Sequence, residues 1–235
     1  MNKFLKPNNK IILWLRLILR MSFFAVALMW PAGSIYWWEA WVIVALWSGF
    51  GLKMTHYLLH HDPELLAERM KFVPLHNEQK IWDKVLMLFF LIAAIGLYLI
   101  PGFDVLRYEW SEPFPVWIEI TAMILHLPCF VLLGWVMREN TYLSQVVKID
   151  KARGHEVITT GPYSLVRHPM YIVVIVLLFA LPVALGSRFA LLLSVFLTFL
   201  LIVRTYYEDR TLYKELEGYV EYTKQTPYRL IPKIW

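Results

Sequence analysis

The segment Pro169–Arg204, PMYIVVIVLLFALPVALGSRFALLLSVFLTFLLIVR, decides the fold class of this chain. It holds most of two apolar runs, 169–185 and 189–206, which are separated only by Gly186-Ser187-Arg188. A helix needs about 20 apolar residues to cross the hydrocarbon core of a bilayer. We therefore expect two antiparallel transmembrane helices joined by a tight turn, which together form a helical hairpin.

The composition of the whole chain agrees with a membrane protein. Of its 235 residues 59% are hydrophobic, whereas soluble domains have about 45–50%. The single cysteine, Cys129, excludes a disulfide framework or a cysteine-based metal cluster, and we expect it to be a buried thiol. The net charge of +5 does not indicate a nucleic-acid partner, because the basic residues lie between apolar runs and form no patch.

Apolar runs that can span a bilayer recur along the chain. The six candidates are about 13–33, 38–59, 84–101, 115–137, 169–185 and 189–206. Segments 60–84 and 138–168 contain four and five Lys or Arg residues, whereas 34–37 contains none and 102–114 contains one. Because Lys and Arg are enriched in cytoplasmic loops, this alternation predicts six spans with both termini in the cytoplasm.

We therefore predict an all-α integral membrane protein with one domain, residues 1–235. Residues 1–137 would form four N-terminal transmembrane helices, and 138–235 would form a catalytic part with the hairpin and a cytoplasmic tail. Between the second and third spans, Asp62 reads as a helix N-cap, Pro63 as the first helical residue and Glu64 as a first-turn acid. This pattern predicts a short interfacial helix.

Polar residues with an unusual arrangement precede the fifth span, in Thr159–Tyr171, TTGPYSLVRHPMY. Gly161-Pro162 predicts a turn. Pro169 disfavours the helical conformation at His168 and is itself favoured at a first helical position, so the fifth helix should begin at Pro169. Free backbone N–H groups there, beside Arg167 and His168, predict an anion site. A basic anchor for lipid headgroups also explains the same residues, and the physics alone favours that interpretation.

The sixth span ends in a second polar group of residues. Arg204 and Glu208 are spaced i,i+4, which is typical of a local salt bridge. Carboxylates at the end of an apolar helix are costly unless they are paired or used. Because the last two helices are antiparallel, these residues should lie near the start of the fifth helix. The predicted cluster at this cytoplasmic mouth contains Arg167, His168, Arg204, Glu208 and Asp209.

A third group of polar residues is His56, His60 and His61, followed by Asp62. Histidines at i and i+4 can bind a metal ion. The chain has no HExxH motif, however, and this group marks a helix end at the membrane interface. We therefore expect no metal site.

The run His155–Tyr171, HEVITTGPYSLVRHPMY, followed by Arg204-x-x-x-Glu208-Asp209, resembles the isoprenylcysteine carboxyl methyltransferase family of integral membrane enzymes. Residues 218–222 and 228–232 are similar to the family's G-x-x-Y and closing R-x-I-P motifs, and 62–69 is similar to a segment common in bacterial members. The sharp motifs cover about 138–235. Two departures bear on substrate choice: Ile172-Val173 follows Tyr171 where the family has Gly, and Asp209 replaces a Glu.

The resemblance implies S-adenosylmethionine as methyl donor, bound at the cytoplasmic face of a bacterial inner membrane. Arg204, His168 and Glu208 would be catalytic, and Arg204 and Asn140 would bind the substrate. The cofactor-binding residues that it implies are Lys148, His155, Glu156, Val157, Ile158, Gly161, Tyr163, Arg167, His168, Pro169, Met170, Tyr171, Glu208 and Asp209.

Methyl transfer from a sulfonium is a direct displacement and needs no metal. The acceptor would be lipidic or small: an isoprenylcysteine-like carboxylate, a phospholipid amine or a thiol. Two alternatives stay open. One is an NADPH-dependent enzyme similar to the sterol reductases, which resemble the family in their C-terminal part. The other is a membrane binding protein without catalytic activity. The sequence does not identify the acceptor or the oligomeric state.

Overall fold

The computed structural model describes residues 7–70, 79–143, 147 and 154–235, and these residues form helices, turns and loops but no strand. The all-α fold class is confirmed. The six long helices are α1 (Pro7–Ala32), α2 (Trp38–His61), α4 (Ile81–Gly102), α5 (Val116–Glu139), α6 (Pro169–Ala184) and α7 (Ala190–Glu215). The shorter elements are α3 (Pro63–Arg69), the π-helical segment η2 (Phe103–Arg107), the 3-10 helix η4 (Gly161–Ser164) and α8 (Tyr219–Gln225).

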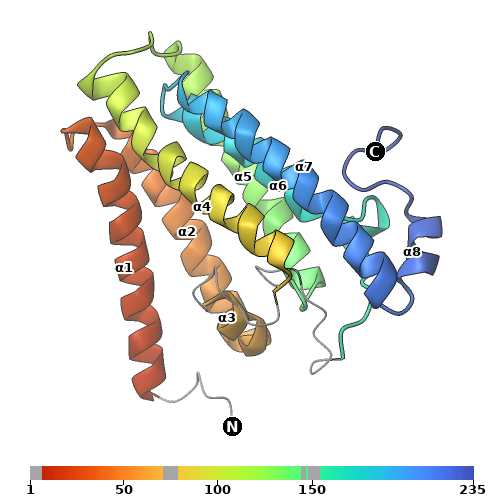
Figure 1. Ribbon diagram of the computed structural model, residues 1–235. Coiled ribbons are helices and arrows are strands. Elements are labelled where there is room, and N and C mark those ends of the chain that lie inside the picture. Colours follow the sequence, from red (N-terminus) through yellow and green to blue (C-terminus); the bar gives the residue numbers. More distant parts are fainter. Residues whose placement is uncertain (1–6, 71–78, 144–146, 148–153) are drawn as a thin grey trace.

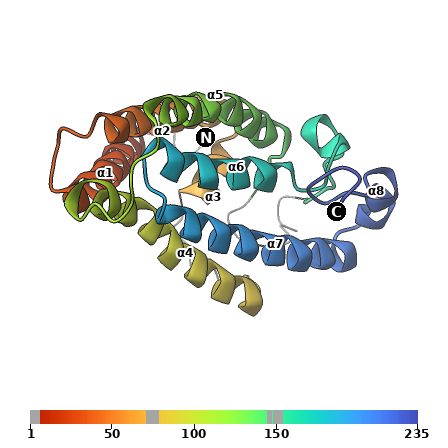
Figure 2. The same ribbon diagram turned by 90° about the horizontal axis from the view of Figure 1, so that it is seen from above.

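Five segments of the described chain are long and apolar enough to cross a membrane, as expected of an integral membrane protein. They contain α1, α2, α4 with η2, α5 and α7. The sixth predicted span, α6, is also apolar but has only 16 residues, which corresponds to about 24 Å of helix against a hydrocarbon core of about 30 Å. Figure 2 shows α6 between α5 and α7, so protein covers this shorter helix on two sides.

The long helices run side by side, with α4 beside α1 and α7, and α5 beside α6 (Figure 1). Leu28, Leu181 and Leu197 belong to the buried core between them. Other large apolar side chains, such as Leu19 and Val131, are exposed on the outside of the bundle. An apolar outer surface of this kind is what contact with lipid requires.

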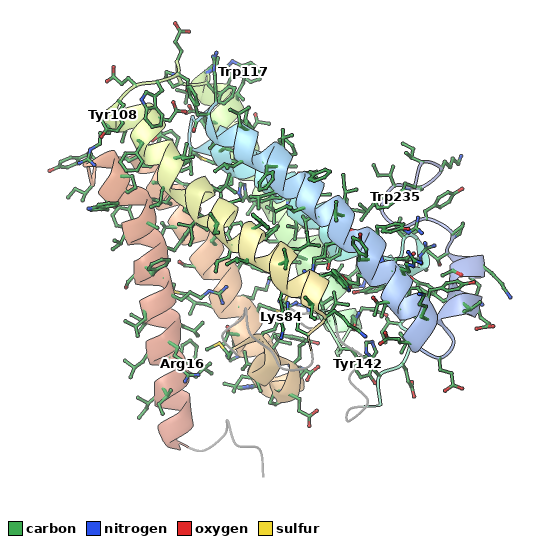
Figure 3. The ribbon with its side chains drawn as sticks, viewed as in Figure 1. Arg16, Lys84, Tyr108, Trp117, Tyr142 and Trp235 are labelled. Carbon is green, nitrogen blue, oxygen red and sulfur yellow. The ribbon has the colours of Figure 1, made fainter. Side chains whose placement is uncertain are left out.

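The loops predicted to be cytoplasmic lie at one end of the bundle. Arg16, Lys84 and Tyr142 lie toward the end where α3 is found, whereas Tyr108 and Trp117 lie at the opposite end (Figure 3). The described parts of segments 60–84 and 138–168 are thus separated from segment 102–114 by the length of the helices. Which end faces the cytoplasm stays a prediction.

Three local predictions are confirmed. The Leu65 amide donates a hydrogen bond of 2.9 Å to Asp62 Oδ1, so Asp62 caps α3. His168 has the non-helical angles φ −125° and ψ 61°, and α6 begins at Pro169. The tight turn of the hairpin contains Gly186 with φ +78°, a conformation that glycine adopts without strain.

Two helices extend further than their apolar runs. Helix α7 continues past residue 206 to Glu215, which adds about 14 Å of polar helix. Most residues of this extension favour helix formation, so the helix does not end where the apolar run ends. Similarly, α4 begins at Ile81, so Asp83 lies in its first turn. Both extensions bring charged side chains close to the candidate site.

Candidate cofactor-binding site

A pocket lies where α6 begins, beside the polar extension of α7. Its space, including the opening to solvent, is about 790 Å³. The residues of the predicted set that line it are Asn140, His155, Glu156, Val157, Ile158, Tyr163, Arg167, His168, Met170, Tyr171 and Glu208. The lining residues that sequence reasoning missed are Tyr142, Leu143, Val147, Leu212, Leu216, Tyr219 and Tyr222.

Four predicted site residues, Gly161, Pro169, Arg204 and Asp209, lie near this pocket but are not part of its lining. Lys148 lies outside the described residues. The contacts of Gly161, Arg204 and Asp209 show what each of them does in the structure.

Gly161 forms the turn between the loop residues 155–160 and η4. It has φ +57°, and a Cβ atom at this position would lie 2.9 Å from Glu139 Cδ and 3.1 Å from Trp135 Nε1. The Thr160 hydroxyl also donates a hydrogen bond to Glu139. Only glycine meets both the conformation and the close approach. The position of Gly161 is therefore explained by packing against α5.

Asp209 is a buried carboxylate held by several donors. Arg167 donates to it from Nε at 2.7 Å and from Nη2 at 3.1 Å. Arg229 Nε and the Tyr219 hydroxyl donate at 2.8 Å each, and His168 Nε2 lies 3.4 Å away. A buried charge is tolerated when it is paired and hydrogen-bonded in this way. Asp209 thus joins the start of α6, helix α7, helix α8 and the C-terminal segment.

Burial and the charge of Asp209 also shift the pKa values of two of its partners. Burial alone would lower the pKa of the Arg167 guanidinium, but the hydrogen bonds and charge of Asp209 raise it. Burial raises the pKa of the Tyr219 phenol, and the Asp209 charge raises it further. At neutral pH, Arg167 is therefore a cation and Tyr219 a neutral donor.

Glu208, the neighbour of Asp209 in sequence, faces the pocket. Its carboxylate accepts a hydrogen bond of 2.5 Å from the Tyr171 hydroxyl, and His168 Nδ1 lies 3.9 Å away. The His168 and Tyr171 rings are parallel, with centroids 5.7 Å apart. The structure thus brings together Arg167, His168, Glu208 and Asp209.

Arg204 is the fifth member of the predicted cluster and lies one helical turn before Glu208, deeper in the bundle. It is buried, and its Nε donates a 2.8 Å hydrogen bond to Asp83 Oδ1 on α4. Its guanidinium carbon lies 5.8 Å from the centre of the Tyr171 ring. Arg204 is therefore placed behind the pocket wall, in contact with a residue that lines it.

Sequence reasoning missed Asp83 and Arg229, which supply charges to these two clusters. The signal for Asp83 was an acid at the predicted start of one apolar span, with Arg204 near the matching end of an antiparallel span. Helices α4 and α7 do pack against each other. Arg229 lies in the closing R-x-I-P motif, but spacing alone does not show that the C-terminal segment returns to the pocket.

The predicted anion site at free backbone amides is largely occupied by the protein itself. The amides of Arg167 and His168 donate to the carbonyls of Tyr228 and Arg229, each at 2.9 Å. The Tyr171 amide donates to the His168 carbonyl at 3.1 Å. These three N–H groups are therefore not available to a ligand, and the side chains of the pocket carry the candidate site.

The two departures from the family pattern lie away from the pocket surface. Ile172 and Val173 are not among its lining residues. Val173 is buried in a cluster with Cys129 and Leu177, where α6 packs against α5. The buried Cys129 thiol agrees with the sequence prediction. Replacing the family's glycine with this bulkier pair therefore fills the helix interface.

The histidine group near the end of α2 forms ring contacts. The rings of His56 and His60 lie 4.7 Å apart, and His61 stacks on Tyr57 at 4.3 Å. Within the part of the chain that the structure describes, no group of three or more His, Cys, Asp or Glu residues is arranged to hold a metal ion.

Comparison with known proteins adds two findings. Residues 120–214 match the model of the isoprenylcysteine carboxyl methyltransferase (ICMT) family. The chain is also 24% identical over 213 residues to the Delta(14)-sterol reductase TM7SF2 of Mus musculus, covering 86% of this chain and 44% of the reductase. The chain thus spans less than half the length of that relative. The family match includes α6, the pocket loop and nearly all of α7, and it supports the resemblance: over residues 120–214 this integral membrane protein is similar to the isoprenylcysteine carboxyl methyltransferase family.

Proposed function

We propose that this protein is a membrane methyltransferase that binds S-adenosylmethionine in the pocket and transfers its methyl group to a lipidic or small acceptor. One observation carries the proposal. The pocket is lined by the family motif, His155–Ile158, Tyr163 and His168–Tyr171 without Pro169, with the Glu208 carboxylate facing into it. All of these residues lie inside the segment that matches the family.

The charge of the pocket supports this cofactor. Arg167 is the one Arg or Lys side chain in the described lining, and it forms an ion pair with Asp209. Glu208 and Glu156 add two carboxylates. A ligand with an ammonium group and a sulfonium fits this balance, whereas the phosphates of NADPH require unpaired cations.

The side chains of the pocket also suit the different parts of the cofactor. Glu208 would hold its amino group or the ribose hydroxyls. The aromatic faces of Tyr163 and Tyr171 would contact the adenine or the sulfonium, and the aliphatic Val157, Ile158 and Leu212 would cover apolar surface. When bound, the cofactor supplies an electrophilic methyl group for direct displacement by the acceptor.

The chain's own residues would orient the acceptor and, where needed, remove its proton. For a carboxylate acceptor, Arg204 would supply the counter-charge, and Asn140, which donates a 2.9 Å hydrogen bond to the Tyr163 hydroxyl, would border it. An amine or thiol must lose a proton, and His168 or Glu208 would accept it. The pocket would open to the cytoplasm of a bacterial inner membrane, with both chain termini on that side, and the acceptor would arrive from the bilayer.

A second candidate is an NADPH-dependent reductase, which the similarity to the mouse sterol reductase favours. Thermal unfolding of detergent-purified protein separates the two. We expect S-adenosylhomocysteine at about 100 times its Kd to raise Tm by roughly 5–10 °C, and NADPH to leave it unchanged. A rise with NADPH alone would favour the reductase, and no rise with either would refute both.

Two variants of α7 locate the binding. Glu208→Gln removes the carboxylate from the pocket, so the stabilisation by S-adenosylhomocysteine should disappear. Glu215→Gln removes an acid from the same helix that pairs with Lys80 at 2.7 Å and is not part of the lining. This control should keep the full stabilisation. Equal stabilisation of both variants would place the ligand elsewhere.

A further inference from the structure

Asp83 is a fully buried acid in the first turn of α4, outside both the pocket lining and the family segment. Its Oδ1 accepts a 2.8 Å hydrogen bond from Arg204 Nε on α7. Its Oδ2 accepts hydrogen bonds from Gln79 Nε2 at 2.8 Å and from the Val147 amide at 3.0 Å. One carboxylate thus ties together α4, α7 and the loop that contributes Val147 to the pocket.

Holding two helices together does not require such a pair. Removing a carboxylate and a guanidinium from water costs several kcal/mol per ion, and well-packed apolar residues of similar size are often as stabilising or more so. Lys80, the residue before α4, also forms an exposed ion pair with Glu215 on α7. The buried pair of Asp83 and Arg204 therefore calls for a role beyond adhesion between helices.

Two short routes lead from Asp83 to the pocket surface. In the first, the Arg204 guanidinium lies 5.8 Å from the centre of the Tyr171 ring, and the Tyr171 hydroxyl donates to Glu208. In the second, the Val147 amide is bound directly, and Val147 lines the pocket. Tyr171 and Val147 are both lining residues of the pocket. Asp83 binds Arg204, which lies behind Tyr171, and it binds the backbone of Val147 directly.

We propose that Asp83 is a positioning residue of the cofactor pocket. It holds Arg204 behind the Tyr171–Glu208 pair and anchors the loop wall at Val147. The proposal rests on the proposed function, because it assigns Asp83 to the S-adenosylmethionine site. Asp83 itself touches neither the cofactor nor the acceptor.

The variant Asp83→Asn tests this role at nearly constant volume. Asparagine has one acceptor oxygen, so it cannot serve donors on both sides. If that oxygen stays on Arg204, the new amide faces Gln79 and Val147. Gln79 Oε1 is buried and has no hydrogen-bond partner among the described residues, so it can accept from this amide. The Val147 amide then has no acceptor, and the loop wall loses its anchor.

The first measurement is the affinity for S-adenosylhomocysteine. We expect Asp83→Asn to lower it about 10-fold or more, by analogy with the losses of about 10–100-fold found when residues that support metal ligands are mutated. Glu215→Gln breaks the exposed Lys80–Glu215 ion pair and should change the affinity by less than about 2-fold. An Asp83→Asn protein that binds as tightly as the wild type would overturn the proposal.

A double variant separates positioning from stability and covers the case in which the single variant folds poorly. Asp83→Leu combined with Arg204→Met replaces both ions with apolar side chains, so it should recover the Tm lost by Asp83→Leu alone. Its affinity for S-adenosylhomocysteine should stay low. Recovery of affinity together with Tm would show a merely structural pair and contradict the proposal.

Amide hydrogen exchange keeps this test apart from that of the proposed function. The Val147 amide should be protected in the wild type and exchange faster in Asp83→Asn, whichever ligand the pocket takes. Equal exchange in both proteins would refute the anchor even if S-adenosylhomocysteine binds. Conversely, a wild type that does not bind S-adenosylhomocysteine would refute the proposed function and the pocket role of Asp83 in one result, without any variant.

Discussion

Removing the charge of Asp209 should destabilise the protein strongly, because this carboxylate joins four segments around the pocket. In Asp209→Asn, one side-chain oxygen becomes an NH₂ group. That oxygen currently accepts from Arg167 and Arg229, or from Arg167 and Tyr219, depending on the orientation of the amide. At least two donors therefore lose their acceptor in either orientation, and two guanidinium groups lose their counter-charge.

The magnitude follows from the burial of these groups. The side chains of Arg167 and Asp209 are each 5% exposed, and breaking such a buried pair costs about 3–5 kcal/mol. At roughly 2–4 °C per kcal/mol for a chain of this size, the expected fall in Tm is about 6–20 °C. The exposed pair Lys80–Glu215, at 38% and 42% side-chain exposure, is worth about 0–1 kcal/mol.

The assay is thermal unfolding in detergent without ligand, followed by tryptophan fluorescence. Wild type, Asp209→Asn and the control Glu215→Gln are compared under one scan rate, because unfolding of membrane proteins is often kinetically limited. A Tm of Asp209→Asn equal to that of Glu215→Gln would refute the reasoning. It would show that the carboxylate contributes no more than a surface acid on the same helix.

Two further predictions concern residues near the pocket. Gly161→Ala should lower Tm by more than Gly154→Ala does. Both glycines have positive φ, at +57° and +62°, but only a Cβ at 161 meets Glu139 and Trp135. Equal losses of Tm would show that the close approach to α5 has no cost. Burial and the Asp209 charge raise the pKa of Tyr219 above its usual value of about 10, so the stability that Tyr219 adds is complete below pH 10 and is lost as the pH rises further. Chemical denaturation should therefore give a constant difference between wild type and Tyr219→Phe from pH 7 to 10 and a smaller difference above it, and a difference that changes below pH 9 would contradict this assignment.

The parts of the fold that sequence predicted are those set by local rules. The length of the apolar runs and the Gly186 turn predicted the hairpin, and Pro169 fixed the start of α6 at the residue expected. The extension of α7 to Glu215 was missed, since the end of an apolar run marks the end of lipid contact and not of helical hydrogen bonding. An apolar run therefore gives a minimum length for a membrane helix.

The site was predicted in part for a similar reason. Motif residues such as Tyr163 and Glu208 line the pocket, but Leu212 and Leu216 were missed, because leucines on a helix carry no local sign of facing a ligand. Asp83 and Arg204 are 121 residues apart in the chain, so their contact depends on the packing of α4 against α7. Long-range pairs of this kind require the fold.

The adjacent acids Glu208 and Asp209 explain how one helix serves both structure and ligand. Successive residues on an α-helix point about 100° apart, so the two carboxylates face different partners. Asp209 is turned to Arg167 and Arg229, which match its charge. Glu208 is turned to the pocket, with the neutral Tyr171 hydroxyl as its nearest donor. The acid on the pocket side is thus Glu208, and under the proposed function its carboxylate would hold a cationic group of the ligand.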